Sequence, residues 1–73
     1  MSDNLLNNKI TEVSNLLAEI EKVNTMIRMH RKRGIDGDFM ASQYEQHKMS
    51  FIHELQTHLL DFELNVFIEN KAA

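Results

Sequence analysis

The sequence predicts an all-α fold, a coiled-coil-like antiparallel hairpin of two long helices. Apolar residues recur at alternating steps of four and three in both halves of the chain, which is the heptad spacing of helices that pack lengthwise. The only two glycines, Gly34 and Gly37, lie together in the middle, and there is no proline, so a single break divides the chain. Residues whose numbers sum to about 72 then face each other, which places Leu17 opposite Leu55.

The first helix is expected at about residues 3–33. Ser2 or Asp3 can cap its N-terminus, because their side-chain oxygens accept hydrogen bonds from the free N–H groups of the first turn. Gly34 suits the left-handed residue that commonly follows a helix. The seam of this helix consists of Leu6, Ile10, Val13, Leu17, Ile20, Asn24 and Ile27.

The second helix is expected at about residues 38–69, after a turn at about 34–37, with Asp36 or Asp38 as its cap. Its seam consists of Lys48, Ile52, Leu55, Leu59, Phe62 and Val66. Residues 62–68 also alternate between apolar and polar in a manner that fits a short strand. We expect helix there, because Phe62 and Val66 continue the seam and no turn residue interrupts it. The whole chain, 1–73, then forms one domain.

The residues beside the seam predict self-association. In an antiparallel pair, the positions flanking the seam on one side of each helix lie next to each other, so His30 is expected beside Tyr44 and Val23 beside Phe51. Here that edge is largely apolar and would be half exposed, so we expect a second hairpin to cover it and complete a four-helix bundle. The alternative is that these residues only widen the seam within one chain. The expected homodimer interface consists of Leu16, Val23, His30, Tyr44, Phe51 and His58.

Asn24 and Lys48 form a polar layer between apolar layers of the predicted hairpin. Such a layer weakens the core but fixes register, because a slipped alignment buries the amide without a hydrogen-bond partner. Alternatively, Lys48 extends its aliphatic stem over the seam and keeps its ammonium group in water.

A second apolar surface is expected near the end of the second helix, pointing away from the seam. A patch of this kind predicts cover by the second copy, by a protein partner or by local collapse of the chain ends. Its residues are Leu60, Leu64, Phe67 and Ile68.

Four basic residues precede the turn, although the net charge of the chain is -3. They could contact phosphates of a nucleic acid or an anionic membrane surface. The favoured alternative is that they offset the negative end of the helix dipole. These residues are Arg28, Arg31, Lys32 and Arg33.

Composition argues against an enzyme. The chain has no cysteine and no glycine-rich phosphate loop, and its four histidines show no metal-ligand spacing, so we expect no catalytic residue, metal or cofactor. No apolar run is long enough to span a bilayer, and we expect a cytoplasmic protein. The sequence thus predicts a non-enzymatic protein-interaction module, adaptor or chaperone-like, with a small nucleic-acid-binding regulator acting through the basic tip as the alternative.

Overall fold

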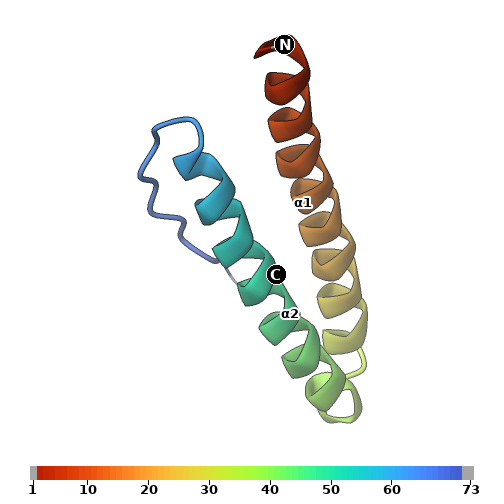
Figure 1. Ribbon diagram of the computed structural model, residues 1–73. Coiled ribbons are helices and arrows are strands. Elements are labelled where there is room, and N and C mark those ends of the chain that lie inside the picture. Colours follow the sequence, from red (N-terminus) through yellow and green to blue (C-terminus); the bar gives the residue numbers. More distant parts are fainter. Residues whose placement is uncertain (1, 72–73) are drawn as a thin grey trace.

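The computed structural model describes residues 2–71 and confirms an all-α hairpin. Helix α1 spans Ser2–Arg31 and helix α2 spans Ile35–Leu60, and the two run antiparallel. The described part of the chain contains no strand and measures 51 × 20 × 13 Å. The helices lie close together near the turn and diverge toward the N-terminus of α1 (Figure 1). The side chains of Ser2 and Asp3, the expected caps of α1, lie outside the described part.

The turn between the helices is shorter than expected and contains Gly34, whereas Gly37 lies in the first turn of α2. Only residues 32–34 separate α1 from α2, and Gly34 has φ 69° and ψ -142°, a positive-φ conformation outside the left-handed helical region that is essentially restricted to glycine. Gly37 is buried where the helices meet, against the main-chain carbonyl group of His30. The expectation that Asp36 or Asp38 caps α2 is wrong, because α2 begins before them. Both carboxylates lie in its first turn, where negative charge favours the helix N-terminus.

Helix α2 ends at Leu60, nine residues before the expected end at residue 69. The main-chain N–H of Leu64 donates to the Leu59 carbonyl at 3.2 Å, and that of Glu63 donates to the Leu60 carbonyl at 2.9 Å. Glu63 has φ 60°. This pair of bonds around one left-handed residue is the Schellman arrangement that terminates helices. Neither the expected helix nor the alternative strand forms over residues 64–71.

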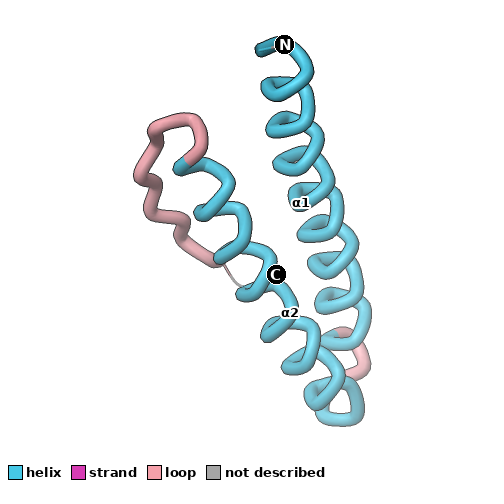
Figure 2. The backbone as a smooth tube through the Cα atoms, viewed as in Figure 1, coloured by secondary structure: helices cyan, strands magenta, loops and turns pink. Residues whose placement is uncertain are grey.

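Residues 64–71, which we call the C-terminal tail, fold back beside α2 without regular secondary structure (Figure 2). Side chains of α2 hold the main chain of the tail. The Gln56 amide donates to the Val66 carbonyl at 3.2 Å, and the Lys48 ammonium donates to the Lys71 carbonyl at 3.1 Å. These hydrogen bonds and the packing of its side chains take the place of the main-chain helical hydrogen bonds that the tail does not form.

The buried core only partly follows the predicted seam. Helix α2 buries its seam residues Ile52 and Leu55, and Ile27 of the α1 seam has no exposed surface. Val23, which flanks the seam of α1, is 7% exposed, whereas the seam residue Leu17 is 53% exposed. Helix α1 is therefore rotated about its own axis relative to the expected pairing, so that its bulky flanking residues point inward. The apolar core of the described chain is Leu16, Val23, Ile27, Ala41, Ile52 and Leu55.

The polar layer is only partly as expected. Lys48 is 6% exposed, so its ammonium group does not reach water freely but binds the tail carbonyl. The Oδ1 atom of Asn24 is buried and has no hydrogen-bond partner within the described chain. An orphaned carbonyl oxygen of this kind costs free energy, since it has given up water without a replacement.

Candidate protein-interaction surface

An apolar groove opens between the helices where they diverge, at the end away from the turn. It has a volume of about 370 Å³. We call it the open-end groove, and its lining residues are Ile10, Val13, Ser14, Leu17, Leu59, Phe62 and Leu64. The wall from α1 thus consists mainly of seam residues. They line an open groove because the two helices diverge toward this end, so that α2 packs less closely against them (Figure 1).

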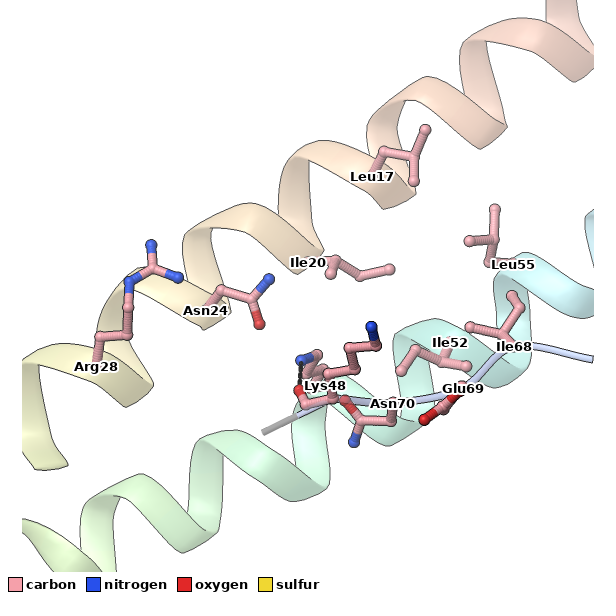
Figure 3. A pocket seen from close by; sticks show the side chains of 11 residues that line it. Leu17, Ile20, Asn24, Arg28, Lys48, Ile52, Leu55, Ile68, Glu69 and Asn70 are labelled. Atoms are coloured by element: carbon pink, nitrogen blue, oxygen red, sulfur yellow. Dashed lines mark hydrogen bonds between the residues drawn. The ribbon is translucent and has the colours of Figure 1, made fainter. Parts of the chain in front are cut away.

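A second groove of about 450 Å³ continues the first toward the turn, and Leu17 belongs to both. Figure 3 shows seam residues of the two helices facing each other across it, with Ile68 of the tail beside Leu55. Arg28 and Lys48 bring positive charge to this part. The two grooves together follow the seam of α1 from Ile10 to Asn24.

The predicted partner patch is not one continuous surface. Leu60 and Leu64 are exposed, and Phe67 is 88% exposed. Leu64 turns into the open-end groove, whereas Ile68 is half-buried and lines the second groove. The tail reversal separates these side chains, which a continuous helix would have aligned.

The residues expected to form the homodimer interface are largely covered within one chain. Leu16, Val23 and His30 are buried, and Phe51 and His58 are half-buried. Val23 is thus not half exposed as expected, whereas Phe51 keeps part of its surface open, so this edge needs less cover from a second hairpin than the sequence predicted.

The expected pairing of His30 with Tyr44 across that edge is confirmed. Their rings stack with centroids 5.6 Å apart, at an angle of 16°. The flanking residues thus widen the contact within one hairpin, as the alternative interpretation held, whereas the homodimer itself stays a prediction.

The basic tip is partly neutralised. Arg28 pairs with Glu21 at 3.3 Å, and Arg31 pairs with Glu45 of α2 at 3.3 Å. Arg33 lies 3.3 Å from the Nδ1 atom of His30. Partners within the chain reduce the positive charge available for phosphates and favour a structural role.

Comparisons with protein-family models, with curated proteins and with solved structures give no match to this chain. No helix within residues 2–71 is long and apolar enough to cross a membrane. The same residues contain no cluster of three or more His, Asp or Glu side chains suited to a metal ion. The molecule is thus defined by its fold, a two-helix hairpin with an apolar groove.

The sequence interpretation missed the exposure of Ile10 and Leu17. A signal for it was present, because α1 carries adjacent apolar residues such as Leu16 and Leu17. Neighbouring residues on a helix point about 100° apart, so α1 has two apolar faces and α2 can bury only one of them.

Proposed function

We propose that this chain is a non-enzymatic, cytoplasmic protein-interaction module that binds through the open-end groove. The observation that carries the proposal is the unpartnered apolar wall of α1, where Ile10 and Leu17 are about half exposed. Exposed apolar patches rimmed by polar residues mark interaction sites on proteins. Grooves between helices accept an amphipathic helix with apolar residues at steps of three and four.

The magnitude of the apolar term supports binding. Full burial of a Leu or Ile side chain contributes about 1.5–3 kcal/mol. Ile10, Leu17 and Leu64 each keep about half of their surface exposed, so covering these three contributes on the order of 2–4 kcal/mol. Additional contacts along the groove would add to this free energy of binding and give a measurable affinity.

The test uses a displayed library of amphipathic helical peptides selected against the immobilised chain. A selected peptide is titrated by fluorescence anisotropy into nanomolar wild type, Ile10→Glu and Ile35→Glu. Ile10 lines the groove and is 51% exposed, whereas Ile35 is the same residue type, is 88% exposed and lies beside the turn. We expect the first variant to bind about 10-fold or more weakly, since it places a charge in an apolar site, and the control to bind as wild type.

Salt dependence separates this function from nucleic-acid binding. Apolar contacts predict an affinity that changes little between low and moderate salt, whereas phosphate contacts predict a steep loss. A parallel titration with mixed RNA and DNA at low salt is expected to show no binding. The proposal fails if no selected peptide distinguishes Ile10→Glu from Ile35→Glu, or if nucleic acid binds and the groove variant does not alter that binding.

A further inference from the structure

We propose that the occupant of the open-end groove is a second copy of this chain, whose first helix packs antiparallel against α1. This inference rests on the proposed function, because it names the partner of the same surface. It differs from the dimer that the sequence suggested, which used the edge containing Val23 and Phe51.

The exposed area of the hairpin is too large for a compact monomer of its mass. A folded monomer of 8.6 kDa exposes about 4,700 Å², whereas this chain exposes 5556 Å². The excess is about 900 Å², close to the roughly 800 Å² that each partner buries in a standard protein interface. A radius of gyration of 14.8 Å, against about 11 Å for a compact chain of this length, agrees with a missing partner.

The seam residues of α1 outside the buried core form a stripe that is complementary to itself. Its members are Leu6, Ile10, Val13, Leu17, Ile20 and Asn24, of which Leu6, Ile10 and Leu17 are about half exposed. When two copies run antiparallel so that residue numbers sum to about 30, every member of the stripe faces another member. Ile10 then lies opposite Ile20 of the second copy, and Val13 lies opposite Leu17. In heptad notation the two seam positions are labelled a and d, and each of these pairs joins an a position to a d position, as antiparallel coiled coils require. An unrelated partner would fit this stripe equally well only if it carried apolar residues at the same spacing.

Polar groups beside the stripe fit the same register. Asn7 and Glu21 fall near each other across the two copies, and Ser14 falls near its own counterpart, so no like charges are opposed. Leu6 of the second copy faces Asn24.

The first test is the mass of the full chain by sedimentation equilibrium, for wild type, Leu17→Glu and Phe39→Glu. Leu17 is near the centre of the proposed interface, and Phe39 is a 71% exposed apolar residue of α2 outside both grooves. We expect a wild-type dimer, a dissociation constant raised at least about 30-fold by Leu17→Glu, and no change from Phe39→Glu. Far-UV circular dichroism checks that both variants keep the wild-type helix content.

The second test does not weaken the core and decides the register. The chain has no cysteine, so Asn7→Cys and Glu21→Cys each introduce a single thiol. Under mild oxidation, we expect the mixture to form the mixed disulfide between the two variants, and Asn7→Cys alone to form none, because its thiols lie at opposite ends of the interface.

Some outcomes overturn only the second copy as occupant. These are a wild-type monomer at every concentration, a dimer unaffected by Leu17→Glu, and efficient cross-linking of Asn7→Cys to itself. A monomer that still binds a selected peptide, with loss on Ile10→Glu, leaves the proposed function standing. A dimer that never binds such a peptide, even when diluted below its dissociation constant, supports self-association and refutes the wider interaction role.

Discussion

Replacing Gly37 with alanine tests how closely the helices approach at the turn. In an open helix interior, Gly→Ala raises the free energy of unfolding by about 1 kcal/mol, because alanine loses less backbone entropy. Here a Cβ atom at position 37 would overlap the carbonyl oxygen of His30 and lie 3.1 Å from the Cβ of Arg33. The overlap involves main-chain atoms that cannot rotate away, so α2 must shift outward.

We therefore expect Gly37→Ala to lower the free energy of unfolding, whereas helix propensity alone would raise it. Forcing extra volume into a packed site costs about 1–3 kcal/mol, and more where the backbone must move. We expect a net loss of about 2 kcal/mol from a total that is about 4–11 kcal/mol for a chain of this length. Urea unfolding followed by circular dichroism, at one fixed protein concentration, measures the change.

Gly34→Ala serves as the control for this prediction. No atom lies within 4 Å of the Cβ it would add, but its φ of 69° disfavours any side chain, so we expect a loss of about 1–3 kcal/mol from backbone conformation alone. A Gly37→Ala variant that equals or exceeds wild type in stability would refute the close approach of the helices and the burial of this glycine.

Three further substitutions test the polar layer, the end of α2 and the basic tip. Asn24→Leu should raise the free energy of unfolding in urea by about 1–2 kcal/mol, because it removes an unpartnered carbonyl oxygen; a loss would show that the amide is satisfied. Glu63→Gly should raise it by up to about 1 kcal/mol and increase the melting temperature, because φ at this position is 60°; a lower melting temperature would count against the turn. Arg31→Gln should lower the free energy of unfolding by about 0.2–1 kcal/mol, because it removes the partly exposed ion pair with Glu45. Filter binding at low salt should show no change in nucleic-acid retention. A loss of retention would show that the basic tip contacts phosphates.

The number of helices, their direction and the position of the turn follow from the sequence alone. Heptad spacing acts within a few residues, and Gly34 and Gly37 are the only interruption of two long apolar patterns. These are local properties, so the antiparallel hairpin could be predicted without knowledge of the packing. The proximity of His30 and Tyr44 also followed, because antiparallel register fixes which flanking residues meet, whereas the stacked arrangement of their rings is seen only in the structure.

Only the tertiary structure decided which face of α1 is buried. Leu16 and Leu17 offer two apolar faces about 100° apart, and the choice between them depends on what α2 presents, which heptad spacing does not specify. The structure buries the face that carries Leu16 and Val23, and the face that carries Ile10 and Leu17 lines the open-end groove.

The end of α2 was also decided beyond the local sequence. Residues 61–69 contain neither glycine nor proline, so nothing in them requires the helix to stop. The tail instead bonds to side chains far along the chain, and Lys71 meets Lys48 across 23 positions. Such contacts exist only after the chain has folded back. Local periodicity does not contain them, and it therefore predicted a longer helix and a closed seam at the place where the structure has a groove.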